Sequence, residues 1–147
     1  MLIIFLVALL CLLILAAGWW VSRPMGFIWR WLFRGVLVAL LAGMALPADV
    51  VMEVRGFVGS LLPVLREVEP GGGASFVVHL VLFALTSALL FVFRRDLRWE
   101  VLLAGLVVLA FVTEGVQLVV DGRFASWGDV GVNLLGVGVG FLGRWIR

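Results

Sequence analysis

The chain has 147 residues, 65% of them hydrophobic, and a mean hydropathy of +1.26. A water-soluble domain of this length has too little interior to bury so much apolar surface, so we expect an integral membrane protein. The net charge of +2 gives no indication of nucleic-acid binding, and the single cysteine excludes an internal disulfide. All 11 basic residues are arginines, a bias that we interpret as the mark of a GC-rich bacterial genome.

The first apolar stretch, residues 2–21, resembles a secretion signal only superficially. It lacks a basic segment in front and is about as long as a full membrane span. Leu10 is too bulky for the position before a lipidated cysteine, so Cys11 is expected to be inert packing. The sequence therefore predicts a retained transmembrane helix here.

Four further apolar stretches follow, at about 28–47, 75–93, 100–120 and 129–146. Helices are the expected form, because each span must satisfy its own backbone polar groups in lipid. The predicted fold is all-α, a polytopic membrane helix bundle of about five transmembrane helices.

Residues 49–69 combine charges with apolar residues at helical spacing, such as Val50, Val54 and Phe57. This pattern predicts an amphipathic helix lying at the outer membrane surface. The run Pro70–Gly73 is expected to break that helix and turn the chain into the third span.

Arginines set the predicted orientation. Eight of them fall on one side of the five-span model: Arg23, Arg30, Arg34, Arg94, Arg95, Arg98, Arg144 and Arg147. The other side holds only three arginines and most of the acids. Because basic residues favour the cytoplasmic side, the sequence predicts an N-terminus outside and a C-terminus in the cytoplasm of a bacterial cytoplasmic (inner) membrane. The tryptophans near the span ends are interpreted as an interfacial belt.

Polar residues gather near the outer ends of the last spans. Glu114 and Gln117 are three residues apart and share a helix face, while Asp129 opens the fifth span and Asn133 follows one turn deeper. The same stripe then continues as glycines, which let a neighbouring helix approach closely. These predicted helix-packing residues are Gly136, Gly140 and Gly143.

The only histidine, His79, lies about one turn into the third span. At a rise near 1.5 Å per residue, His79 and Asn133 lie roughly 6 Å below the outer boundary and Glu114 about 10 Å below it. The short loop that carries Arg123 lies directly above them. Three separate helices are therefore expected to bring polar side chains to a similar depth on one side of the membrane.

This arrangement resembles the VanZ-like family of small membrane proteins, named for a teicoplanin-resistance determinant. The resemblance rests on an ordered set over about residues 76–140: a histidine at the start of one span, Glu-x-x-Gln, an arginine loop, and Asp-x-x-x-Asn-x-x-Gly. These residues are His79, Glu114, Gln117, Arg123, Asp129, Asn133 and Gly136. The resemblance implies a role in the cell envelope and, for the founding member, antibiotic resistance through reduced sensitivity to lipoglycopeptides.

The chain departs from that family in two ways. Its loop reads Asp121-Gly122-Arg123 where Pro-Gly-Arg is common, and its first span is additional to a four-span core. We accordingly divide the chain into residues 1–26, an extra N-terminal transmembrane helix with its cytoplasmic loop, and residues 27–147, a VanZ-like membrane domain. The extra helix is a candidate contact for a membrane-protein partner.

The polar residues allow two interpretations. As an internal clasp, they would pin three helices together by hydrogen bonds. As a pocket open to the outer leaflet, they would bind a ligand, with Asp129 either a helix cap or a ligand-binding residue. One histidine and scattered carboxylates give no ligand pair at helical spacing, so neither a metal nor another cofactor is expected.

Two functions follow from these interpretations. In the first, the pocket binds an envelope lipid or lipid-linked precursor, with Arg123 on a phosphate; if the bound molecule is also processed, His79 and Glu114 are the candidate acid and base. Whether the protein is an enzyme is left open. In the alternative, the protein is a non-catalytic membrane subunit that stabilises a polysaccharide or envelope complex. Ion transport is disfavoured, because charged residues do not continue through the inner half of the spans.

Overall fold

The computed structural model describes residues 1–61 and 72–145, which form helices throughout and contain no strand. In chain order the elements are α1 (Leu2–Val21), α2 (Phe27–Ala45), α3 (Ala48–Leu61), α4 (Gly72–Phe93), α5 (Trp99–Gln117), α6 (Trp127–Phe141) and the 3₁₀ helix η2 (Leu142–Trp145). The all-α class is confirmed for this part of the chain. Four of these helices, α1, α2, α4 and α5, are long and apolar enough to cross a membrane.

The boundaries of the first spans follow local backbone rules. α1 covers the predicted residues 2–21, whereas α2 ends at Ala45, two residues before the predicted end. Leu46 takes an extended conformation, because the residue before a proline is disfavoured in helical geometry, and Pro47 follows it.

The predicted surface helix corresponds in part to α3. The structure describes it only to Leu61, so the predicted continuation over residues 62–69 lies outside the described residues. The predicted break at Pro70–Gly73 is wrong in its second half, because Gly72 and Gly73 already belong to α4. Glycine weakens a helix by only about 1 kcal/mol, so a long apolar helix tolerates it in the first turn. Residues 70 and 71 are not among those described.

The last predicted span, residues 129–146, corresponds to α6 together with η2. α6 has 15 residues, which gives a length of about 22 Å and leaves it too short to cross a bilayer alone. It begins two residues earlier than predicted and passes directly into the tighter 3₁₀ turn of η2. Residue 146 lies outside the described part of the chain.

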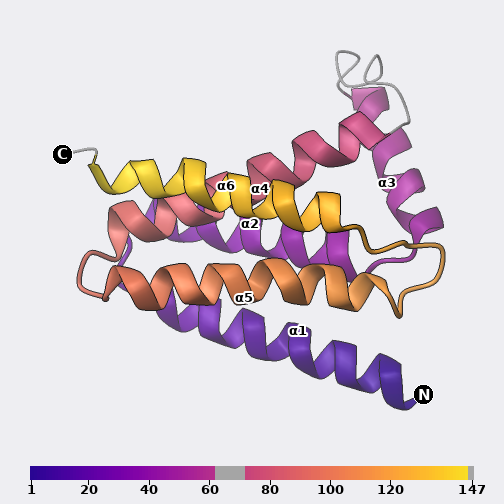
Figure 1. Ribbon diagram of the computed structural model, residues 1–147, viewed down its shortest axis with the longest axis horizontal. Coiled ribbons are helices and arrows are strands. Elements are labelled where there is room, and N and C mark those ends of the chain that lie inside the picture. The colour runs from indigo at the N-terminus through magenta and orange to yellow at the C-terminus, as the bar shows by residue number, and fades with distance from the viewer. Residues whose placement is uncertain (62–71, 146–147) are drawn as a thin grey trace.

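Apart from α3, which stands across the others at one end, the helices run roughly along one direction, and the chain reverses at the ends of the bundle (Figure 1). α4 and α6 pack side by side along their length, α5 contacts both of them, and α2 packs against α4 and α5. α1 packs on α2 and diverges from the rest of the bundle towards its N-terminus. The shared core includes the fully buried side chains of Phe83, Phe91, Met44 and Ala110.

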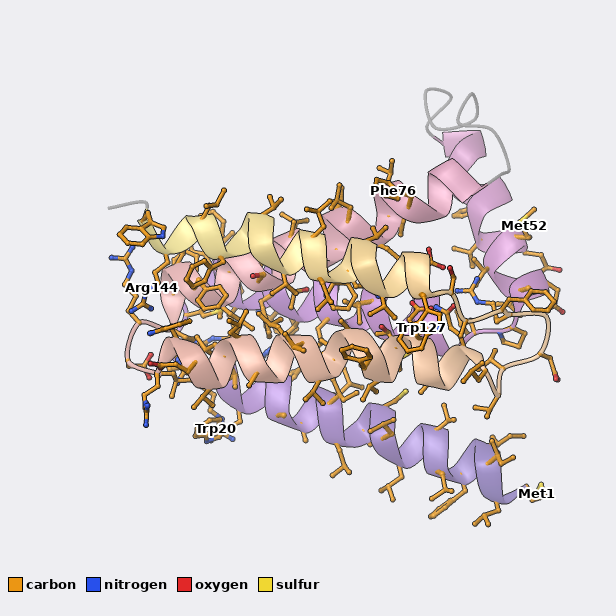
Figure 2. The ribbon with its side chains drawn as sticks, in the orientation of Figure 1. Met1, Trp20, Met52, Phe76, Trp127 and Arg144 are labelled. Atoms are coloured by element: carbon orange, nitrogen blue, oxygen red, sulfur yellow. The ribbon has the colours of Figure 1, made fainter. Side chains whose placement is uncertain are left out.

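Charged residues separate the two ends of the bundle. We call the end with the α1–α2 turn, the α4–α5 turn and η2 the arginine end; its arginines are Arg23, Arg30, Arg34, Arg94, Arg95, Arg98 and Arg144. We call the opposite end, with α3 and the α5–α6 loop, the acidic end, after Asp49, Glu53, Asp121 and Asp129. Trp20 and Arg144 lie at the first end, and Met1, Met52 and Trp127 at the second (Figure 2).

The close approach of α4 and α6 depends on glycine. A Cβ atom added at Gly136 would lie 2.7 Å from the Leu80 carbonyl oxygen, and one at Gly140 would lie 2.6 Å from the Ala88 nitrogen. Real Cβ atoms do not approach backbone atoms so closely, so no larger residue fits without moving a helix. The Ser87 hydroxyl donates to the Val137 carbonyl oxygen at 2.8 Å and ties the same crossing. Gly143 lies further along this interface, where an added Cβ would be 3.2 Å from Val92.

Candidate functional site

Asn133 of α6 is the centre of a buried polar network between three helices. Its side chain is fully buried, and its amide nitrogen donates to Thr113 Oγ1 and to Glu114 Oε1 of α5, each at 3.3 Å. Its Oδ1 therefore faces His79 Nδ1 of α4 at 2.9 Å. Because that oxygen can only accept, Nδ1 must carry the proton. The structure therefore confirms the predicted convergence of the His79, Glu114 and Asn133 side chains.

The Glu114 carboxyl group connects this network to a surface groove. One oxygen receives the Asn133 amide and lies 3.9 Å from His79 Nδ1, while the other accepts from the Ser126 backbone N–H at 3.3 Å. The side chain is almost completely buried by protein, yet it lines a groove of about 270 Å³ between α5 and the start of α6. The other lining residues include Phe111, Leu118 and Trp127. The groove is thus apolar around one carboxyl group.

Gln117 and Arg123 carry buried donors without partners in the described residues. The Gln117 side chain is buried, and its amide nitrogen has no hydrogen-bond acceptor. Arg123 donates through Nη2 to the Gly43 carbonyl oxygen near the end of α2, while its buried Nε has no acceptor. Neither residue is a hydrogen-bond partner of Glu114, which accepts from Asn133 and Ser126.

The Arg123 side chain is also less exposed than a side chain in a fully solvated loop would be. The preceding Gly122 has a φ of +71°, a conformation that favours glycine, and an added Cβ there would lie 3.0 Å from Ala48 Cβ. The Ala48 backbone N–H donates to the Asp121 carbonyl oxygen at 3.3 Å. These contacts fold the α5–α6 loop onto the start of α3 and leave Arg123 half-buried against α2.

The cap of α6 is Ser126, not Asp129. The Ser126 hydroxyl accepts from the Gly128 N–H at 3.0 Å, and Asp129 is the third residue of the helix. The N-cap interpretation of Asp129 is therefore wrong, because the chain enters the helix two residues earlier than predicted. Asp129 remains in the first turn, where a carboxylate is favourable, and its side chain is half-buried.

Two site residues were missed from the sequence. Thr113 accepts from Asn133 while donating to the Ala110 carbonyl oxygen at 2.8 Å, and Ser126 supplies both the helix cap and the N–H on Glu114. The spacing Ser126-x-x-Asp129 before an apolar run is a capping-box signal and could have identified Ser126. Thr113 has only a weak signal, a position four residues before Gln117 on the same helix face.

The geometry favours recognition over bond-breaking. The groove presents a carboxyl group within an apolar wall, whereas the buried, unpartnered N–H donors of Gln117 and Arg123 belong to residues that do not line it. His79 does not line the groove, because Asn133 holds its Nδ1 inside the bundle. Within residues 1–61 and 72–145, no three His, Cys, Asp or Glu side chains converge on a point where a metal could bind.

Comparison of the chain with protein-family models, with curated proteins and with solved structures gives no match.

Proposed function

We propose that the chain crosses the membrane five times, with α6 and η2 acting together as the fifth span. The 15 residues of α6 and the four of η2 give about 22 Å plus about 8 Å, close to the roughly 30 Å of a bilayer's hydrocarbon core. Their tight packing along α4 supports a shared passage through lipid. Met1 and Arg144 lie at opposite ends of the bundle, as an odd number of crossings requires (Figure 2).

In this proposal the arginine end faces the cytoplasm of a bacterial inner membrane, and the acidic end faces outside. α3 then lies at the outer surface, with Met52, Val54 and Phe57 exposed to the interfacial region. The groove beside Glu114 opens within the outer leaflet, a short distance below the headgroups.

Within this frame, the protein is a VanZ-like membrane protein that binds an envelope lipid or lipid-linked precursor. The observation that carries the proposal is the apolar groove that the buried Glu114 carboxyl group lines. Gln117 and Arg123, which each have a buried donor without a partner among the described residues, lie close to Glu114 in the chain but are not part of the groove lining. An apolar wall with a few polar groups suits an amphiphile that has a phosphate or carbonyl beside its chains.

A binding role is favoured over processing because no nucleophile is positioned at the groove. Ser126 accepts from Gly128 and caps α6, and His79 bonds to Asn133. Ser126 lines the groove, but among the described residues its hydroxyl is not hydrogen-bonded to a base, and His79 does not line the groove. The expected consequence for the cell is altered sensitivity to lipoglycopeptides or altered envelope synthesis.

A second candidate is the non-catalytic subunit, in which the network is only a clasp. It is favoured by the position of Asn133, whose side chain joins α4, α5 and α6 in one buried set of hydrogen bonds. α1, which has only Gly18 buried, would then offer its remaining surface to a partner.

The two candidates differ in the effect of Glu114→Gln. Glutamine keeps the shape and most of the hydrogen bonds, so folding should hold, but a ligand that requires the carboxylate should be lost. We expect lipid that co-purifies with the protein, identified by mass spectrometry, to lose its lipid-linked species about tenfold in Glu114→Gln, equivalent to about 1.4 kcal/mol. The same species should accumulate or disappear in the lipidome of a deletion strain.

Glu100→Gln is the matched control, since Glu100 is on the same helix at the arginine end and is 48% exposed in its side chain. It should leave both the content of the lipid-linked species and the thermal midpoint unchanged. If Glu114→Gln and Arg123→Ala both keep the lipid content and envelope phenotype of the wild type, the binding proposal is wrong. The polar network would then be only a structural clasp.

A further inference from the structure

A second, larger groove lies on the other side of the bundle, between α1 and α5, and we propose that it holds an acyl chain of an anionic phospholipid from the leaflet at the arginine end. Its volume is about 540 Å³, and its walls come from facing surfaces of the two helices together with parts of α2 and α4. This inference does not depend on the function proposed for the Glu114 groove, which lies at the opposite end of α5.

The groove is apolar and is opened by small residues. On α1 it is lined by Leu10, Ile14 and Gly18, and on α5 by Gly105. A Cβ added at Gly105 would meet nothing within 4 Å, so the space beside it is empty. The only hydroxyl side chain among the lining residues belongs to Thr86, and that hydroxyl donates to the Leu82 carbonyl oxygen at 2.8 Å. No polar group is left there for a headgroup.

The length of the groove matches one leaflet. Its lining on α5 extends from Val101 to Val112, a rise of about 16 Å along the helix. This is close to half of the roughly 30 Å hydrocarbon core. An acyl chain that enters from the arginine end would therefore end near the bilayer centre, beside Leu10 and Val112.

The charges at the mouth determine the kind of lipid. Val21 and Leu97 line the groove, and Arg23 and Arg98 lie within two residues of them at the arginine end. The Arg98 side chain is 81% exposed and forms only a solvent-exposed ion pair with Glu100, at 3.7 Å, which a phosphate can displace. Arg94, in contrast, is buried and committed to Val21 and Asp96. The indole of Trp20 lines the same mouth, at the level where tryptophans meet headgroups.

Native mass spectrometry with palmitoyl-oleoyl phosphatidylglycerol and its phosphatidylcholine counterpart tests the proposal on the full chain. The wild type should retain phosphatidylglycerol in preference to phosphatidylcholine. Gly105→Phe fills the groove and should lower retention about tenfold. Gly138→Phe is the matched control, because Gly138 of α6 is equally open and lies away from the groove; it should retain lipid like the wild type.

Headgroup selection is tested separately. Arg98→Gln should reduce the preference for phosphatidylglycerol about fivefold while chain binding persists, whereas Arg144→Gln on η2 should not. Phosphatidylglycerol with brominated chains should quench the fluorescence of Trp20, identified as the component that is absent in Trp20→Phe. This measurement requires no substitution that fills the groove. Glu114→Gln should change none of these results.

Equal retention by Gly105→Phe and Gly138→Phe, at similar thermal midpoints, would overturn the proposal. So would equal retention of the two lipids by the wild type, absence of Trp20 quenching, or a dimer that Gly105→Phe abolishes, which would assign the groove to a second copy. If Gly105→Phe fails to fold, the smaller Gly105→Leu and the quenching measurement decide.

Discussion

At the arginine end, the buried guanidinium group of Arg94 and the half-buried one of Arg34 have hydrogen-bond partners, whereas at the acidic end Arg123 has one partner and a buried Nε that is left without one among the described residues. Arg94 reaches both oxygens of Asp96 and the Val21 carbonyl, and Arg34 donates to Ser22 at 3.0 Å while its guanidinium lies 3.4 Å from the centre of the Trp19 ring. At the acidic end, Arg123 and Gln117 each keep a buried N–H without an acceptor in the part of the chain that the structure describes.

This difference separates structural polar groups from candidate ligand-binding ones. An arginine whose buried N–H groups are hydrogen-bonded connects the ends of helices, so we expect it to stabilise the fold. A buried donor without a hydrogen-bond partner lowers the stability of the fold, and a ligand that supplies an acceptor would remove that cost. Both ends are rich in charge, so charge alone does not tell them apart.

The largest expected effect concerns the crossing that holds the acidic end together. Gly136→Leu places a side chain against the Leu80 carbonyl and should destabilise the protein by about 3 kcal/mol, separating His79 from Asn133. Gly138→Leu, two residues away on the open face, should be nearly neutral. Thermal midpoints in detergent compare them; equal midpoints would mean that the crossing does not fix the network.

The next effect tests whether the arginine end is truly structural. Arg94→Ala removes hydrogen bonds from a charged, buried side chain and should cost about 2 kcal/mol. The exposed Arg98→Ala should cost little. Chemical unfolding in mixed micelles gives the difference, and limited proteolysis should cut first near the α1–α2 turn in Arg94→Ala. Indistinguishable variants would contradict the assigned role.

A smaller pair of substitutions should have opposite signs. Gln117→Leu removes an unsatisfied donor and should stabilise the empty protein by about 1 kcal/mol while abolishing lipid binding at the acidic end. Ser22→Ala removes a fully buried hydroxyl that bonds both Arg34 and the Trp19 carbonyl, and should destabilise by about 1 kcal/mol. If Gln117→Leu also destabilises the lipid-free protein, its donor is not an orphan.

The smallest effect is a pH dependence at the arginine end. The hydrogen bonds from Arg94 hold the pKa of Asp96 below its ordinary value of 3.8. A depressed pKa contributes stability above the unfolded pKa, and that contribution is lost as the pH falls through the folded pKa. The wild type should therefore be slightly more stable than Asp96→Asn at pH 7, and the gap should close below about pH 4. A gap that widens in acid would reverse the assignment.

Sequence periodicity predicted helix face and the relative level of residues along the bundle well, because both depend on local geometry. The rise per residue placed His79, Glu114 and Asn133 at similar levels, and the structure brings these side chains together. The same counting placed Gly136 and Gly140 on one stripe, and both face α4. The number of crossings and the side that faces outside remain predictions.

Loop-dependent contacts were not predictable in the same way. Arg123 was expected in the loop directly above the cluster, but the left-handed Gly122 and the contact with Ala48 direct its side chain to Gly43. Arg94 was interpreted only as a marker of orientation, although it turns inward to Val21. Such contacts join residues far apart in the chain, so they cannot be predicted from the spacing of neighbouring residues.

The attachment of α1 has a consequence for how the protein is made. Val21 and Arg94 are separated by 73 residues, so at roughly 5–20 residues per second the first helix is synthesised about 4–15 s before its anchor. During that interval α1 can already contact α2, at Gly18 and through Arg34 and Ser22. The first helix to leave the ribosome thus receives its anchor from Arg94 only after α4 has been made, and the α4–α5 turn is the segment whose emergence supplies that anchor.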